Sequence, residues 1–165
     1  MRLSATVALL LASGAAFAAP APAPRPGSAL EQFFVGITEG SGTVQVIMSG
    51  KHGMRDRSRG RMDSSGALLL DQVVEEEGKP ARRRSWRLVR QGGNRVTGTI
   101  SDVQGAVRGD ISGETLHLRY RMKEGPSVEQ WITLQPGRRS ARNRMTFHRF
   151  GVKVATVDSV IRKVD

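Results

Sequence analysis

The sequence contains no cysteine in its 165 residues. Disulfide bonds, thiolate metal ligands and a cysteine nucleophile are therefore excluded. A lipid anchor attached to a cysteine behind a signal peptide is excluded for the same reason. We therefore expect the mature protein to be soluble rather than tethered by a lipid.

Motifs typical of enzymes and metal sites are also missing. The three histidines, His52, His117 and His148, lie far apart, and none has His-x-His or His-Glu-x-x-His spacing. No Gly-x-Ser-x-Gly motif is present. We therefore predict a protein that is not an enzyme and that has no metal site and no cofactor.

A sustained helical period is absent, and turn signals recur about every 8–12 residues instead. The clearest predicted strand is residues 115–122, where apolar and basic residues alternate. Residues 83–90 and 128–134 repeat this alternation of two faces. Gly105, Gly109 and Gly113 recur at intervals of four, but no helix follows them. We interpret them as strand bends or bulges rather than as a phosphate loop.

These strands predict an all-β fold of about eight to ten antiparallel strands. A β-sandwich and a closed up-and-down barrel are both compatible with the pattern, and consecutive hairpins favour the barrel, which has no free edges. The expected turns include Glu39-Gly40 and residues 50–53. Residues 31–35 predict a helical turn or an aromatic plug, and residues 157–164 a short helix or a last strand.

The N-terminus has the pattern of a secretory signal peptide. Arg2 precedes a short apolar run that ends in Ala16-Phe17-Ala18, and four prolines follow within residues 20–26. A membrane-spanning helix would need about 20 predominantly apolar residues, which the prolines prevent. We predict a signal peptide at 1–18, an Ala/Pro-rich linker at 19–29 and one domain at 30–165, with a periplasmic or secreted location.

Basic residues strongly outnumber acidic ones, with 26 lysines and arginines against 15 aspartates and glutamates. Such a charge favours anionic partners, and export favours anionic lipid or polysaccharide over nucleic acid. The alternative is that the positive charge only keeps the surface soluble. Both interpretations remain open from the sequence.

Four groups of residues occur in the order seen in a known family. They are Phe33-Phe34-x-Gly36 with Gly42-x-Val44-Gln45; Gly78 with Arg84-x-Trp86; Asp102-Val103 and Gly105, Gly109 and Gly113 leading to Tyr120; and Asn143-Arg144-Met145 with Phe150-Gly151-Val152-x-Val154. On these motifs, residues 30–165 resemble a family of lipocalin-like (calycin-type) bacterial envelope proteins of unknown function, many of which look like lipoproteins. The resemblance implies a lipocalin-like β-barrel and no known activity. Lipid anchoring does not carry over, because the cysteine is missing.

The interior of a barrel of this kind is either filled by side chains or holds one small ligand. Both alternatives require an apolar inner face. Buried Tyr120 and Trp86 need hydrogen-bond partners, which a ligand or ordered water can supply. The predicted ligand-binding residues are Trp86, Arg84, Leu88, Leu116, Leu118, Tyr120, Met122 and Ile132.

Arginines cluster at residues 82–90 and again at residues 55–61. If Trp86 points inward, Arg84 and Arg90 do too, near the barrel ends. An inward guanidinium can bind a carboxylate or phosphate, and Arg84 is the stronger candidate. The competing interpretation pairs the first cluster with residues 75–77 across a hairpin. The second cluster alternates along one strand, so it faces either solvent or an anionic partner.

Three functions follow from these observations. The first is an exported, non-enzymatic binding or carrier protein for a lipophilic, anionic small molecule. The second is an envelope protein whose basic exterior contacts lipopolysaccharide, anionic lipid or another protein, including peripheral membrane contact. The third, an enzyme acting on an envelope lipid or glycan, is the least favoured because no catalytic constellation is visible.

Overall fold

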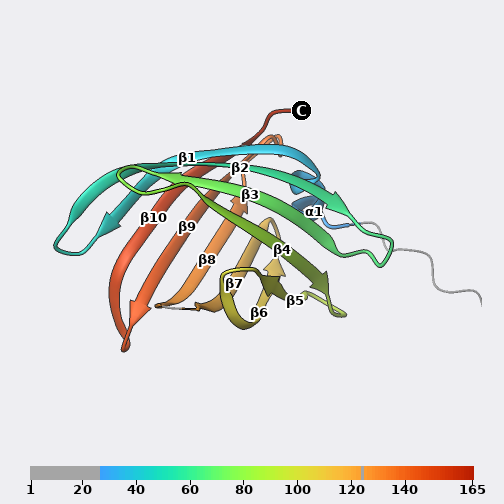
Figure 1. The fold of residues 1–165 in the computed structure, drawn as a ribbon. Helices are drawn as coiled ribbons and strands as arrows, with labels where there is room; N and C mark the ends of the chain where they lie inside the picture. The colour runs from blue at the N-terminus through green and yellow to red at the C-terminus, as the bar shows by residue number, and fades with distance from the viewer. Residues whose placement is uncertain (1–26, 124) are drawn as a thin grey trace, which may run out of the picture.

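The computed structural model describes residues 27–123 and 125–165, and most of these residues lie in β-strands. The predicted signal peptide and residues 19–26 of the predicted linker lie outside this part of the chain. Within residues 27–123 and 125–165, one helix precedes ten strands (Figure 1). The elements are α1 (Ala29–Phe34), β1 (Gly36–Val46), β2 (Gly50–Met62), β3 (Leu68–Glu76), β4 (Arg82–Arg90), β5 (Arg95–Ile100), β6 (Val103–Ser112), β7 (Thr115–Met122), β8 (Ser127–Leu134), β9 (Ser140–Arg149) and β10 (Val152–Lys163).

Each strand pairs antiparallel with its neighbour in the sequence, and β1 pairs with β10 to close a barrel. The prediction of an all-β, antiparallel up-and-down lipocalin-like barrel is therefore confirmed, and the sandwich is excluded. Apolar residues at alternate positions point inward, as in β7, where Leu116, Leu118 and Tyr120 are buried and Arg119 is exposed. This is the two-residue period expected of a strand with one face in a core.

Two of the expected turns are wrong. Glu39-Gly40 lies inside β1, where Gly40 pairs with Asp56 of β2. The β1–β2 turn occupies residues 47–49, and β2 already begins at Gly50. Glycine marks a close approach of a neighbouring side chain in β1 rather than a change of direction, because a Cβ on Gly40 would lie 2.0 Å from Asp56 Oδ2.

The last segment of the chain and Gly105 each follow one of the predicted alternatives. Residues 157–164 form the end of β10 rather than a helix, apart from Val164 beyond the strand. Gly105 has φ +72° and lies where the β6–β7 register shifts. It is a bulge, as predicted, and no phosphate loop is formed there. Gly109 instead pairs with β7 in regular register, and Gly113 lies in the β6–β7 turn, so neither is a bulge.

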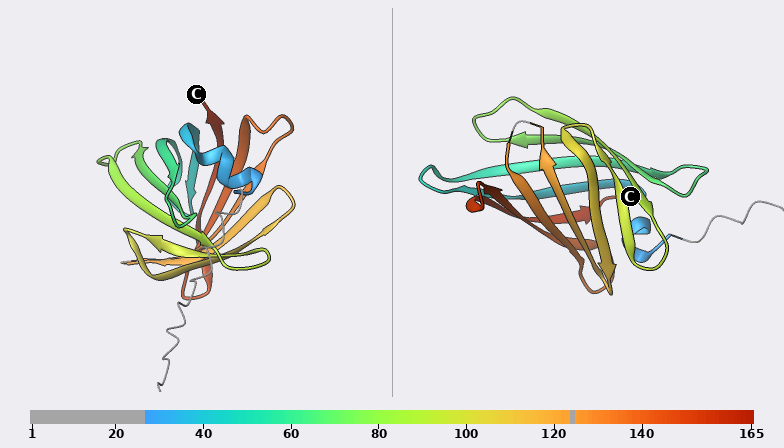
Figure 2. Two further views of the ribbon diagram at one scale, coloured as in Figure 1. Left: turned by 90° about the vertical axis from the view of Figure 1, so that its right-hand side faces the viewer. Right: turned by 90° about the horizontal axis from the view of Figure 1, so that it is seen from below.

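Helix α1 closes one end of the barrel. Ser28 caps the helix, and its side chain and that of Glu31 form a capping box. Leu30, Phe33 and Phe34 are buried, so the predicted aromatic plug is confirmed. In the left view of Figure 2 the helix lies across the barrel end. Neither α1 nor any other helix in the described part of the chain is long and apolar enough to cross a membrane.

The close fit of α1 against the barrel depends on a glycine in β2. A Cβ built on Gly60 would lie 1.8 Å from the carbonyl oxygen of Phe34 and 2.7 Å from Leu70 Cδ2. The first contact is with backbone, which no rotamer change relieves. The glycine therefore lets the C-terminal end of the helix sit directly on the strand.

We predict that Gly60→Ala lowers the free energy of unfolding by about 2 kcal/mol or more, because overpacking against backbone forces the helix away from the barrel. Urea unfolding followed by circular dichroism measures the change. Gly53→Ala is the matched control in the same strand, since its Cβ would meet only Glu77 Oε2 at 3.7 Å. An equal loss in both variants would show that the plug does not depend on this contact.

Candidate ligand-binding cavity

The barrel interior is hollow toward the end opposite α1. A cavity of about 830 Å³ is lined by residues of the strands and of the hairpin connections at that end, including Lys79 and Pro126. Phe34 of α1 lies at its floor. This volume falls within the range of about 300–1,000 Å³ that is usual for small-molecule sites. Of the two alternatives for the interior, the structure has the hollow one.

Seven of the eight predicted ligand-binding residues line this cavity. They are Arg84, Trp86, Leu88, Leu116, Leu118, Met122 and Ile132. The eighth, Tyr120, is buried, and its ring packs edge-on against Trp86 with centroids 6.2 Å apart. The structure thus brings the eight together, while their contact with a ligand stays a prediction.

A belt of polar side chains crosses the interior, and most of these residues were not predicted from the sequence to point inward. Trp86 Nε1 donates to Gln72 Oε1 at 3.0 Å, and Gln72 Nε2 donates to Asp56 Oδ1 at 3.0 Å. The indole N–H is therefore satisfied within the protein and needs no ligand. The polar residues of the belt lie on the same inward strand faces as their apolar neighbours. Along each strand they alternate with outward arginines and carboxylates, and this alternation in the sequence could have predicted that they point inward.

The same belt continues on the opposite wall. Tyr120 donates its hydroxyl proton to Gln130 at 2.9 Å, and Gln130 Nε2 donates to Asn143 at 2.8 Å. Asn143 Nδ2 then donates to Ser159 Oγ at 3.0 Å. Burial raises the pKa of Tyr120 to about 12, against the opposing charge of nearby Arg84. The phenol therefore stays neutral and acts as a donor at physiological pH.

Asp56 is the buried acid of the belt. Burial raises the pKa of its carboxyl group, and the hydrogen bond from Gln72 and the charge of Arg84 only partly oppose this. The side chain fits because Gly40 on the adjacent strand has no Cβ. Asp56 thus lies in an environment that disfavours its charged form.

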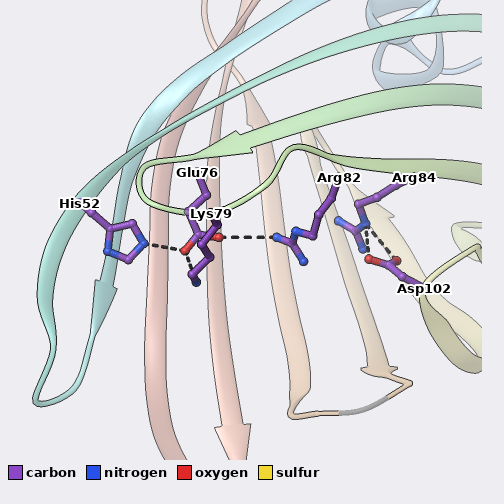
Figure 3. A network of polar contacts seen from close by, with 6 residues as sticks. All are labelled: His52, Glu76, Lys79, Arg82, Arg84 and Asp102. Atoms are coloured by element: carbon purple, nitrogen blue, oxygen red, sulfur yellow. Dashed lines mark hydrogen bonds and ion pairs between the residues drawn. The ribbon is translucent and has the colours of Figure 1, made fainter.

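Arg84 carries the positive charge that lies deepest in this interior. The residue is 8% exposed, so its predicted inward orientation is confirmed. The same prediction for Arg90 is wrong, because Arg90 is exposed and bonds to the carbonyl oxygen of Gly93 in the β4–β5 turn. Arg84 Nε lies 2.9 and 2.8 Å from the two carboxylate oxygens of Asp102 (Figure 3), and the Arg84 guanidinium carbon is 4.9 Å from the centre of the Trp86 ring. Its Nη2 is buried and has no hydrogen-bond partner among the residues that the structure describes.

The competing interpretation pairs the arginines of residues 82–90 with the carboxylates of residues 75–77 across the β3–β4 hairpin. It is correct for Arg82 but not for Arg84. Arg82 Nη2 lies 3.6 Å from Glu76 Oε2. Glu76 also contacts His52 Nε2 and Lys79 Nζ, each at 2.5 Å (Figure 3). Burial opposes ionisation of Glu76, but the hydrogen bonds from Lys79 and His52 outweigh it and lower its pKa. This network lies at the cavity mouth, on the inner side of the hairpin.

The second arginine cluster lies outside the barrel. Arg55, Arg57, Arg59 and Arg61 are all exposed, as their alternation predicted. The first three border a hollow of about 970 Å³ on the outer face of β1 to β4, together with Asp71 and other carboxylates. Arg57 pairs with Glu39, and Arg61 lies 3.5 Å from Asp71. This face is therefore an outer surface whose arginines are partly neutralised.

Comparison with known proteins places the chain in a family. Residues 9–163 match the model described as protein of unknown function (DUF3833). The chain belongs to the DUF3833 family. No curated protein matches the sequence significantly. The predicted likeness to a family of unknown function is confirmed, while lipoprotein character stays an expectation from the resemblance.

Among solved structures, the barrel of this DUF3833 protein is similar to the S-type phycobiliprotein lyase CPES from Guillardia theta. The TM-score is 0.65 at 8% sequence identity, and the match covers 82% of this chain and 92% of that one. At this identity the likeness shows a common fold. The prediction that the protein is not an enzyme is wrong in light of this finding, because a barrel of the same fold is named a lyase and the fold therefore does not exclude catalysis.

We predict that Asp56→Asn raises the free energy of unfolding at pH 7. The folded-state pKa of Asp56 is raised, so the ionised carboxylate disfavours folding at any pH above that pKa. The advantage of the variant shrinks as the pH falls through the folded-state pKa. It vanishes below the unfolded value of about 3.9, where both states are protonated.

Thermal or urea unfolding between pH 3 and pH 8 checks this dependence. Asp71→Asn is the matched control on the outer face of β3, where the carboxylate is exposed. A surface change of this kind alters stability by less than about 0.5 kcal/mol. A destabilised Asp56→Asn at pH 7 would contradict the assigned environment.

Proposed function

We propose that this DUF3833 protein binds a lipophilic small molecule with one anionic group inside its barrel, in the cell envelope. The observation that carries the proposal is the Arg84 guanidinium. It is buried beside a cavity of about 830 Å³, and its Nη2, which carries two N–H groups, has no partner among the described residues.

A buried donor without an acceptor is costly, by about 1–3 kcal/mol and more for a charged group. Natural proteins rarely leave such a group, so an unpaired one indicates a missing partner. Asp102 binds the Nε side of the guanidinium. The two terminal nitrogens of the guanidinium are suited to carboxylate or phosphate oxygens, which guanidinium groups bind with short, charge-assisted hydrogen bonds.

The cavity walls favour an apolar body for the same ligand. Aliphatic, methionine and aromatic side chains line it on both sides of the polar belt, including Val46, Met54, Leu118, Met145 and Phe147. Burial of apolar surface contributes about 25 cal/mol per Å². Methionine side chains adapt to ligands of varied shape. An amphiphile with one acidic group matches this combination.

The cavity mouth favours the entry of an anion. Lys79, Arg82 and Lys123 line the cavity at its open end. Glu76 also lies there, paired with Lys79 and Arg82, so the mouth carries a net positive charge rather than charges of one sign. A net positive mouth raises the local concentration of anions and their rate of association. The predicted signal peptide supports an envelope location. The outer arginine surface is a weaker basis for function, because Arg57 already has a carboxylate partner.

We predict that Arg84→Gln weakens the binding of hexadecanoate about tenfold to a hundredfold, since a hydrogen bond to a charged group contributes about 1.5–3 kcal/mol. Binding of hexadecanol, which has the same chain and no charge, should not change. Fluorescence of Trp86 reports binding in a Trp131→Phe background. Trp131 is suitable for removal because it stacks on His117 rather than lining the cavity.

Arg87→Gln is the control on the same strand, because Arg87 is exposed and lies 3.5 Å from Asp63. Arg84→Lys separates charge from hydrogen-bond geometry, and we expect an intermediate affinity. Equal affinity of Arg84→Gln and the parent protein for hexadecanoate would contradict the role of Arg84. The proposal fails if the protein binds no hexadecanoate and native mass spectrometry finds no lipophilic anion on protein purified from its own envelope.

A further inference from the structure

Large apolar side chains are exposed at the tips of two hairpins at the open end of the barrel. Met48 of the β1–β2 turn is 101% exposed and Phe150 of the β9–β10 turn is 95% exposed. Ile47 and Val152 beside them are 50% and 64% exposed. Such exposure of large apolar groups, gathered in one place, is characteristic of sites that bind a membrane or another protein.

The two tips lie side by side. Strands β1 and β10 are neighbours in the barrel, and the backbone N–H of Ile47 donates to the carbonyl oxygen of Val154 at 3.0 Å. Both tips project at the end away from α1 in Figure 1 and again in the right view of Figure 2. This is the end at which the cavity opens, because Val46, Phe147 and Ala155 at the roots of the same hairpins line it.

The backbone at these tips does not favour the side chains found there. Phe150 and Gly151 form a two-residue connection with φ of +52° and +79°. Turns with two positive φ values strongly prefer Asn-Gly or Asp-Gly. Met48 also has a positive φ, of +71°. A bulky residue in this region is unusual, so local stability does not explain either choice.

Positive charge surrounds the tips. Residues 45–53 and 147–156 contain no aspartate or glutamate. They contain Lys51, Arg149 and Lys153, all of which are exposed. The guanidinium carbon of Arg149 lies 5.8 Å from the centre of the Phe150 ring. Apolar tips within a cationic border match a surface that is apolar inside and anionic outside.

We propose that these two hairpin tips form a docking surface for an anionic lipid bilayer. Met48 and Phe150 enter the boundary between headgroups and acyl chains, where aromatic side chains are favoured. Lys51, Arg149 and Lys153 meet the anionic headgroups, each strengthening binding about fivefold. The cavity mouth then faces the bilayer, so a lipophilic ligand passes between membrane and barrel without crossing water. Only this last consequence rests on the proposed function.

The test is co-sedimentation of the mature protein with phosphatidylcholine vesicles that contain or lack phosphatidylglycerol. We expect binding that requires phosphatidylglycerol and that weakens as the salt concentration rises. The double variant Met48→Asn/Phe150→Asn should bind at least about tenfold more weakly, from the loss of two large apolar side chains. Its stability should be unchanged or higher, because asparagine accepts a positive φ.

Two controls separate the docking surface from general properties of the protein. Val164→Asn makes the same apolar-to-polar change at the other end of the barrel, where Val164 is 48% exposed and pairs with Ile37, and should bind like the parent. The triple variant Lys51→Gln/Arg149→Gln/Lys153→Gln should lose vesicle binding. The variant Arg95→Gln/Arg108→Gln/Arg142→Gln changes net charge equally, at exposed residues elsewhere, and should retain most of it.

Equal losses in the two triple variants would overturn the proposal, because binding would then follow total charge. Vesicle binding that is unaffected by Met48→Asn/Phe150→Asn would also overturn it. A third result would also overturn it: the parent protein does not bind vesicles but dimerises in sedimentation experiments, and the double variant does not dimerise. The tips would then be a contact surface for a second copy of the chain. Hexadecanoate binding in solution is measured without vesicles, so its failure is distinguishable from failure of the docking surface.

Discussion

The pairing of β1 with β10 is the constraint on which the rest of the structure depends. It joins residues more than a hundred positions apart, such as Thr38 and Lys163, and turns a meander of hairpins into a closed barrel. Closure removes both free sheet edges and defines an inside and an outside for every strand. Glycines make this seam possible, because a Cβ on Gly42 would lie 2.1 Å from the carbonyl oxygen of Asp158 on β10.

Closure also divides the interior into two parts with different roles. Toward α1, buried apolar side chains such as Leu30, Phe33 and Leu68 fill the barrel. Away from α1 the barrel is hollow, and a polar belt that includes Gln72 and Gln130 forms part of the cavity wall. The belt satisfies its own hydrogen bonds, which keeps its side chains in fixed positions. Arg84 is the exception, and this exception is the basis of the proposed ligand site.

Much of this architecture follows from local sequence patterns. The alternation in β7 predicts which residues point inward, and the position of Trp86 two residues after Arg84 predicts that both share the inner face. The order of turns predicts an up-and-down connection. These predictions succeed because a strand's two-residue period depends only on neighbouring residues.

Other features depend on contacts between strands, which local patterns do not contain. Asp102 lies in the β5–β6 turn, 18 positions from Arg84, while residues 75–77 offered a nearer carboxylate. Gly40 looked like a turn because the Asp56 side chain that requires it belongs to another strand. The exposure of Phe150 is visible only once the β9–β10 turn is seen to project at the open end. A crystal structure with bound hexadecanoate tests the central claim most directly. We expect a carboxylate oxygen within hydrogen-bond distance of the Arg84 guanidinium and the acyl chain in the cavity. A carboxylate bound elsewhere, with Nη2 still unpaired or bonded to water, would contradict the account.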